Sequence, residues 1–231
     1  MRILIVSATK LEIDPLARQY GVTFTKENFY TTRRGMDFID ILITGVGAVQ
    51  MTYHLTNALL KTQYNLVLNI GIAGTFSGRI QLGEIVHVVN DEFVDFGVFS
   101  KGVFQTATEA ALIDATEKPF ETNKIANRTP WHKELPQIKQ VKGATVNRVT
   151  DVFTEIDGFV KKFNPDIETM EGAAFFYVMN HQSIPYFQIR GISNIVGARD
   201  KSQWKIPQAT DNLCRFTTRF IDNVKRGLML S

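Results

Sequence analysis

Short, almost continuously apolar segments recur along this chain, and they constrain its fold more than any other feature. They are rich in β-branched or aromatic residues, and most are followed by Gly or Ser. The segments are residues 3–7, 39–44, 66–70, 85–89 and 186–192. Runs of this kind suit strands that are buried on both faces, as in a parallel or mixed sheet covered by helices.

Helical patterns alternate with these segments. Residues 49–61 follow a glycine turn, and residues 171–181 are so apolar that they should lie against the sheet. The last helix has an apolar stripe at spacings of three and four, formed by Ala209, Leu213, Phe216, Phe220 and Val224. We therefore predict an α/β protein, a three-layer α/β/α sandwich around a central mixed, mostly parallel sheet.

The composition changes between about residues 114 and 142, where the chain is polar and carries Pro119, Pro130 and Pro136. A strand-like segment at residues 143–146 resumes the α/β alternation afterwards. We interpret residues 114–142 as a surface excursion or lid within a single domain spanning residues 1–231, and not as a linker.

Charge and composition exclude several classes of protein. The 26 Lys and Arg residues nearly balance the 23 Asp and Glu residues, and no run of like charges concentrates the net charge of +3, which argues against nucleic acid as a partner. No stretch approaches the roughly 20 apolar residues that cross a bilayer, so no membrane partner is expected. The first apolar run meets Lys10 and Glu12 too early for a signal peptide, and the single Cys214 fits a reducing compartment. We expect a cytoplasmic protein.

Common cofactor and catalytic motifs are incomplete or absent. Gly45 and Gly47 end a strand as in a dinucleotide fingerprint, but Gln50 occupies the third glycine position. The sequence has no phosphate-binding P-loop and no serine nucleophile elbow, and its four histidines are scattered. We predict that the protein needs no metal and no cofactor.

Polar side chains follow the predicted strands in residues 7–12 (SATKLE), 168–172 (ETMEG) and 190–194 (RGISN). Taken singly, Glu12 and Glu171 are carboxylates of the kind that helix starts carry. In open α/β sheets, however, ligands collect beyond the carboxyl ends of the strands. The shared placement of these three segments therefore predicts one site.

Several segments, in order and at family-like spacing, resemble the nucleoside phosphorylase/nucleosidase superfamily, in particular its methylthioadenosine/S-adenosylhomocysteine nucleosidase branch. They are the opening strand with Glu12, ILITGVGAVQM, NIGIAGTFSGRIQLGEIVHV, ETMEGAA and IRGISN. NIGIAGTF and ISNIVGARDKSQWKIPQA resemble the futalosine hydrolase branch most closely. The resemblance implies a small-molecule purine nucleoside as substrate. It also implies a homodimer or larger homo-oligomer, in which residues 96–104 could complete a neighbour's pocket.

The resemblance implies catalytic roles for two residues. Glu12 would orient and deprotonate the attacking water, with Arg190 helping to hold the water network. Asn194 would contact the purine leaving group, with Ser193 supporting it.

The remaining substrate contacts implied by the resemblance surround the sugar. Glu171 would accept hydrogen bonds from both ribose hydroxyls, and its position at a helix start favours the ionised form. Met170 would pack against the sugar face. Apart from the resemblance, Val149 is a candidate for stacking on the base or closing the pocket.

Two departures from the adenosine nucleosidase pattern bear on the substrate. That branch has Asp where this chain has Asn194, and Ser where this chain has Ile72. The asparagine amide presents a fixed donor and a fixed acceptor, which match a 6-oxo group and a protonated N7 better than the edge of adenine. A mismatched edge would leave buried polar groups unpaired, so this position predicts a 6-oxopurine base. Ile72 removes a possible contact to water or phosphate.

Together with the 6-oxopurine preference, the resemblance to the futalosine hydrolase branch implies hydrolysis of futalosine to hypoxanthine and dehypoxanthine futalosine, a step of menaquinone biosynthesis. Futalosine carries a benzoate-bearing extension at its 5′ side, with which Arg199 or Lys201 could pair; both could equally belong to a solvated loop.

Three alternatives stay open: a purine nucleoside phosphorylase, a methylthioadenosine/S-adenosylhomocysteine nucleosidase, and a non-catalytic nucleoside-binding protein. A phosphorylase would need an arginine in the first loop and a small hydroxyl residue after Asn69. This chain has SATKLEID and Ile72 there. A protein that only binds or stores nucleosides would not need Glu12, because it would have no water to activate.

Overall fold

A nine-stranded mixed sheet forms the centre of the computed structural model, which describes residues 1–76, 78–121, 123–129, 138–198 and 200–225. The strand order is β10-β9-β5-β11-β4-β1-β3-β2, and β8 pairs with β5 at the side of this path. The strands are β1 (Arg2–Ser7), β2 (Phe29–Arg34), β3 (Asp37–Ile43), β4 (Leu66–Thr75), β5 (Ile85–Phe93), β8 (Lys124–Ala126), β9 (Lys139–Thr145), β10 (Ile167–Thr169) and β11 (Tyr186–Ile195).

One half of this sheet closes on itself. Besides its parallel pairing with β9, β10 pairs antiparallel with β4, with Glu168 opposite Gly74. The strands β4, β11, β5, β9 and β10 therefore form a ring. This closure brings the end of β10 next to the ends of β4 and β11, although these segments lie far apart in the sequence.

The prediction of a mixed sheet is confirmed, but its mostly parallel character is not. Parallel pairs are β1–β3, β1–β4, β4–β11, β5–β9 and β9–β10. Antiparallel pairs are β2–β3, β5–β8, β5–β11 and β4–β10, almost as many. The β2–β3 hairpin and the ring closure account for part of the difference, because neither follows from the apolar pattern of the central strands.

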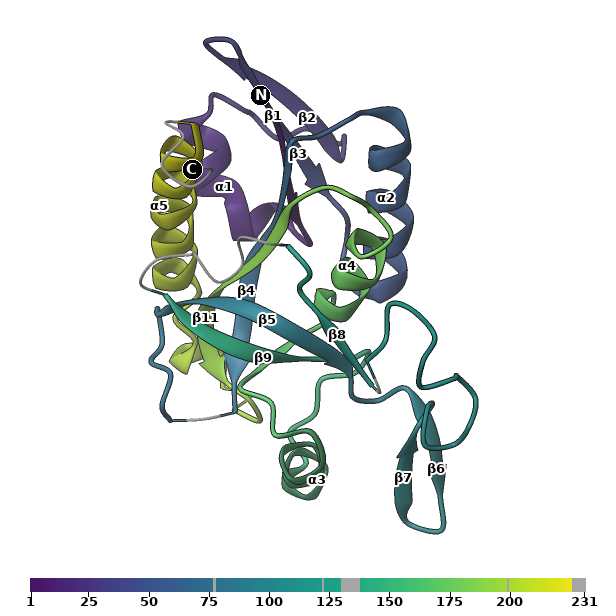
Figure 1. The fold of residues 1–231 in the computed structure, drawn as a ribbon. Helices are drawn as coiled ribbons and strands as arrows, with labels where there is room; N and C mark the ends of the chain where they lie inside the picture. Colours follow the sequence, from purple (N-terminus) through teal and green to yellow (C-terminus); the bar gives the residue numbers. More distant parts are fainter. Residues whose placement is uncertain (77, 122, 130–137, 199, 226–231) are drawn as a thin grey trace.

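Helices cover both faces of the sheet, so the predicted three-layer arrangement is confirmed. They are α1 (Lys10–Gln19), α2 (Ala48–Lys61), α3 (Phe153–Phe163), α4 (Gly172–Met179) and α5 (Ile206–Lys225). α1 and α5 lie on one face and α2 and α4 on the other, while α3 lies beside the ring (Figure 1). Alternate residues of β1 enter different cores: Ile3 and Ile5 face α1 and α5, whereas Leu4 and Val6 lie in the core of α2 and α4. No described helix is long and apolar enough to cross a membrane.

The polar segment at residues 114–142 is only partly a surface excursion. Its residues Lys124–Ala126 form β8, which pairs antiparallel with β5, and the start of β9 also lies within it. Residues 130–137 lie outside the described part of the chain. A second small sheet, the hairpin of β6 (Gly97–Ser100) and β7 (Val103–Thr106), projects from the body and was not predicted (Figure 1).

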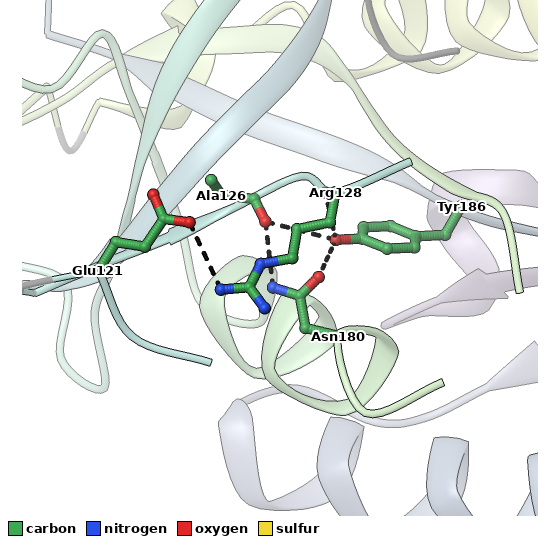
Figure 2. Close-up of polar contacts among 5 residues, drawn as sticks. All are labelled: Glu121, Ala126, Arg128, Asn180 and Tyr186. Atoms are coloured by element: carbon green, nitrogen blue, oxygen red, sulfur yellow. Dashed lines mark hydrogen bonds and ion pairs between the residues drawn. The ribbon is translucent and has the colours of Figure 1, made fainter. Parts of the chain in front are cut away.

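The C-terminal end of α4 is tied to β8 and β11 by a polar cluster (Figure 2). Asn180 caps the helix, and its Nδ2 donates to the Ala126 carbonyl at 3.0 Å. The Tyr186 hydroxyl donates to Asn180 Oδ1 and accepts from the Arg128 amide at 3.2 Å. Burial raises the pKa of Tyr186 to about 12, so it stays a donor at physiological pH. One end of α4 is thereby fixed in place.

Candidate active site

A cavity of about 420 Å³ opens at the carboxyl ends of β1, β4, β10 and β11. β1 and β11 both pair parallel with β4, so their ends meet at one edge of the sheet. The predicted residues that line it are Glu12, Ile72, Val149, Met170, Glu171, Ser193 and Asn194. Among the described residues of the predicted set, only Arg190 is absent from the wall, and Arg199 lies outside the described residues.

Glu12 is held at the start of α1 by donors from two strand ends. Its Oε2 accepts from the Thr9 amide at 2.8 Å, the Thr9 hydroxyl at 2.9 Å and the Ser7 hydroxyl at 3.3 Å. Its Oε1 accepts from the Ile72 amide at 3.0 Å. A carboxylate oxygen has two lone pairs, so Oε1 keeps one for a further donor. The sequence analysis noted Ile72 only for the missing hydroxyl, whereas its backbone N–H positions Glu12.

Arg190 lies beneath the cavity and not in its wall. The side chain is 1% exposed, and burial lowers its pKa while the carboxylates of Glu171, Glu12 and Asp91 raise it. A Cβ built on Gly71 would lie 2.5 Å from Arg190 Nη1 and 2.6 Å from Glu12 Oε1. Both side chains therefore pass close to Gly71, which leaves no room for a methyl group.

Glu171 is the N-cap residue of α4, but its side chain does not cap that helix. Its Oε1 instead accepts from the Gly47 amide at 2.8 Å, across 124 residues of sequence. Gly47 has φ +99°, a conformation that L side chains rarely adopt, so the turn before α2 needs glycine. Burial raises the pKa of Glu171, and Arg190 and the Gly47 amide oppose that shift. Desolvation thus acts against the ionisation that its place at a helix start favours.

Asn194 presents its amide in one orientation. Its Nδ2 donates to the Ile195 carbonyl at 3.1 Å, and its Oδ1 accepts from the Ser193 hydroxyl at 2.8 Å. Turned the other way, Oδ1 would face the Ile195 carbonyl, acceptor against acceptor. The second hydrogen on Nδ2 and the second lone pair on Oδ1 stay free for a ligand. The Ser193 hydroxyl therefore helps to orient the Asn194 amide.

A comparison of the sequence with models of protein families identifies the family of this chain. The family model described as the phosphorylase superfamily matches residues 2–222. The chain belongs to the phosphorylase superfamily.

The curated relatives of this phosphorylase-superfamily chain carry two names. Futalosine hydrolase of Acidothermus cellulolyticus is 28% identical over 217 residues, covering 91% of this chain and 86% of the relative. Futalosine hydrolase of Thermus thermophilus is 26% identical over 195 residues, covering 81% and 83%. The 5′-methylthioadenosine/S-adenosylhomocysteine nucleosidase of Bacillus cytotoxicus is 28% identical over 235 residues, covering 99% and 94%.

Solved structures show the same fold. The native structure of Helicobacter pylori futalosine hydrolase superposes on this phosphorylase-superfamily chain with a TM-score of 0.77 at 16% identity, covering 96% of this chain and 98% of the other. The 5′-methylthioadenosine/S-adenosylhomocysteine nucleosidase of Helicobacter pylori, bound to butyl-thio-DADMe-Immucillin-A, gives the same values. At this identity the likeness concerns the fold.

Sequence reasoning missed part of the site of this superfamily member. Trp204 lines the cavity, and its indole N–H donates to the Ala198 carbonyl at 2.8 Å. Gly47, read only as a turn, supplies the amide that holds Glu171. Lys201, which the sequence analysis did name as a possible partner of a substrate carboxylate, is the cationic side chain among the described lining residues. Within the described part of the chain, no group of three His, Cys, Asp or Glu side chains could hold a metal ion.

Proposed function

We propose that this chain hydrolyses the N-glycosidic bond of a 6-oxopurine nucleoside, with futalosine as its substrate. One observation carries the proposal: two buried carboxylates, Glu12 and Glu171, and one oriented amide, Asn194, line the same cavity. A cavity of about 420 Å³ is within the usual size of small-ligand sites.

The chain is an N-glycosidic bond hydrolase, and this arrangement suits that reaction. Cleavage of the bond builds positive charge on the ribose and negative charge on the departing base. A site for the transition state therefore needs anionic groups at the sugar and hydrogen-bond donors at the base. Glu12 and Glu171 supply the first, and the Asn194 amide supplies the second.

Glu12 is placed to act on water. Its Oε2 is occupied by three donors, whereas Oε1 has one donor and a remaining lone pair, so Oε1 is the oxygen that accepts a proton from water. Arg190 Nε and Nη2 have no hydrogen-bond partner among the described residues, and these buried donors suit water molecules behind the carboxylate.

Glu171 suits the ribose hydroxyls. The Gly47 amide occupies one acceptor position of its carboxylate, and the other positions can receive hydroxyl protons. Met170 beside it adds an apolar surface for the sugar face.

Asn194 favours a 6-oxo base. Its Nδ2 can donate to O6 while its Oδ1 accepts from a protonated N7, and the Ile195 carbonyl prevents the amide from turning to match adenine. Sequence identity does not decide between the two groups of relatives. Futalosine hydrolases and methylthioadenosine/S-adenosylhomocysteine nucleosidases each include a relative that is 28% identical to this chain. The amide of Asn194 favours futalosine as the substrate.

The residues that line the cavity around Glu12 favour hydrolysis over phosphorolysis, because they offer little to bind a phosphate ion. Ala8, Thr9 and Leu11 line this side without a cation, and Ile72 offers no hydroxyl to a phosphate.

Product analysis tests the proposal. Futalosine, inosine and methylthioadenosine are incubated with the enzyme in buffer with and without phosphate. We expect free hypoxanthine from futalosine in phosphate-free buffer. Strict dependence on phosphate with formation of ribose 1-phosphate would identify a phosphorylase, and preferential release of adenine would overturn the assignment of the base. Tight binding of the nucleoside with no free base formed would identify a storage protein.

A further inference from the structure

The first turn of α4 lacks the usual cap. An N-cap side chain normally accepts from the second or third amide of its helix, but the side chain of Glu171 bonds to Gly47 instead. The amides of the first turn have no partner within the helix, so they need acceptors from elsewhere.

Threonines on two neighbouring strands supply these acceptors. The Ala173 amide donates to Thr145 Oγ1 at 2.8 Å, and the Gly172 amide donates to Thr169 Oγ1 at 3.2 Å. Thr145 has a single hydroxyl proton, which it donates to Asp91 Oδ1 at 2.8 Å. The N-terminus of α4 is thus connected through Thr145 to a carboxylate on β5.

Asp91 is the acceptor at the end of this chain of bonds. Its Oδ2 accepts from Gln188 Nε2 of β11 at 3.1 Å, and the residue is 0% exposed. The Thr145 hydroxyl and the Gln188 amide thus both donate to this carboxyl group. Asp91 therefore joins β5, β9, β11 and the start of α4 at a point beneath the cavity.

The backbone of α4 rests directly on this carboxylate. A Cβ added to Gly172 would lie 2.1 Å from Asp91 Oδ2, and one added to Gly143 of β9 would lie 2.3 Å from it. Both distances are too short for any side chain. The helix begins against Asp91, one residue after Glu171.

We propose that Asp91 is a positioning residue for the reaction: through Thr145 it holds the first turn of α4 and so sets the direction of the Glu171 carboxylate. The inference rests on the proposed role of Glu171 at the ribose. A fully buried carboxylate lowers stability unless its surroundings compensate, and burial raises the pKa of Asp91 to about 7. Since a buried carboxylate does not help the chain to fold, we explain Asp91 by its role in positioning Glu171.

Three variants separate positioning from general stability. Asp91→Asn keeps the shape of the side chain and removes the charge. Gln188 Oε1 has no hydrogen-bond partner among the described residues, so its amide can turn and accept from the new amide. Thr145→Val removes the hydroxyl that joins Ala173 to Asp91, and Thr145→Ser, the matched control, keeps it.

The first readout is kcat/KM for the purine nucleoside that the wild type cleaves best. We expect a loss of about tenfold or more for Asp91→Asn and Thr145→Val, and a value near wild type for Thr145→Ser. In a Glu171→Gln background, Asp91→Asn should change kcat/KM by less than about twofold, because no ribose-binding carboxylate is left to position. Equal losses in both backgrounds would mean that Asp91 serves stability alone and would overturn the inference.

The second readout needs no substrate. Amide hydrogen exchange at Gly172 and Ala173 should speed up in Asp91→Asn and Thr145→Val but not in Thr145→Ser, while exchange in α2 and α5 stays unchanged. Unchanged exchange at these two amides would overturn the inference. Faster exchange in a chain that cleaves no nucleoside would retain Asp91 as the anchor of α4 and reject the proposed function.

Discussion

Glu12 and Arg190 reach over the same glycine, so that a Cβ on Gly71 would lie 2.6 Å from Glu12 Oε1 and 2.5 Å from Arg190 Nη1. Contacts this short force at least one side chain to move. Glu12 is held by four hydrogen bonds and Arg190 is fully buried, so neither has a ready alternative place.

We therefore expect Gly71→Ala to lower kcat/KM by about 100-fold or more, because a shift of Glu12 misplaces the attacking water. Steady-state kinetics measure the loss. Gly158→Ala is the control, since a Cβ there meets nothing within 4 Å and Gly158 lies in α3. Near-normal activity of Gly71→Ala would show that Glu12 keeps its working position beside a methyl group.

Glu12→Gln should abolish turnover while leaving the nucleoside bound. The amide cannot take a proton from water, and loss of a general base lowers kcat by about 100-fold or more. The measurements are kcat and the Kd of a slowly cleaved nucleoside, with exposed Glu117→Gln as control. Retention of more than about a tenth of the wild-type kcat would remove Glu12 from the role of base.

Asn194→Asp should move base preference toward 6-aminopurines. A carboxylate cannot donate to O6, but it can share a proton with N7 and accept from an exocyclic amine. We expect the ratio of kcat/KM for methylthioadenosine to that for inosine to rise by about tenfold or more. Asn223→Asp, exposed on α5, should leave the ratio unchanged. An unchanged ratio in Asn194→Asp would place base selection elsewhere in the cavity.

Lys201 is the described cation best placed to recognise the carboxylate of futalosine, because it lines the cavity. Lys201→Ala should raise KM for futalosine about fivefold and leave KM for inosine unchanged, since inosine lacks the carboxylate. Lys205→Ala, exposed and outside the lining residues, is the matched control. The same assay tests Arg199→Ala, for which the sequence makes the same prediction. Equal effects on both substrates would dismiss the specificity role.

Stability should depend on pH through Asp91. Burial raises its pKa from 3.8 to about 7, so between these values the folded chain holds a proton that the unfolded chain releases. Its contribution to stability is complete below about pH 4 and is lost as pH rises through about 7. Thermal unfolding of Asp91→Asn and wild type from about pH 5 to about pH 8 should show Tm of the variant rising relative to wild type. The buried Glu171 is common to both proteins and cancels; a constant difference in Tm would contradict the shift.

The elements that sequence analysis predicted well are those with a local signal. β1 and the first half of β4 are almost continuously apolar, and α5 has its stripe buried at Ala209, Leu213 and Phe220. Glu12 and Asn194 line one cavity, as expected for side chains near the carboxyl ends of strands. The glycines and the serine do not end these strands, however, since β4 continues to Thr75 and β11 to Ile195.

β8 had no such signal. The residues Lys124, Ile125 and Ala126 do not form a strand pattern by themselves, and they become one through pairing with β5. Residues within a polar, proline-containing segment can therefore join the main sheet when a partner strand offers its edge.

The sequence by itself determined the layers of this protein and which strand ends carry polar side chains, because burial of an apolar face depends on local periodicity. Only the tertiary structure decided how those side chains are held. Gly47 meets Glu171 across 124 residues, and Asp91 lies beneath α4, because the pairing of β10 with β4 closes the ring that brings their elements together. Such contacts depend on the register of distant strands, which no local pattern specifies.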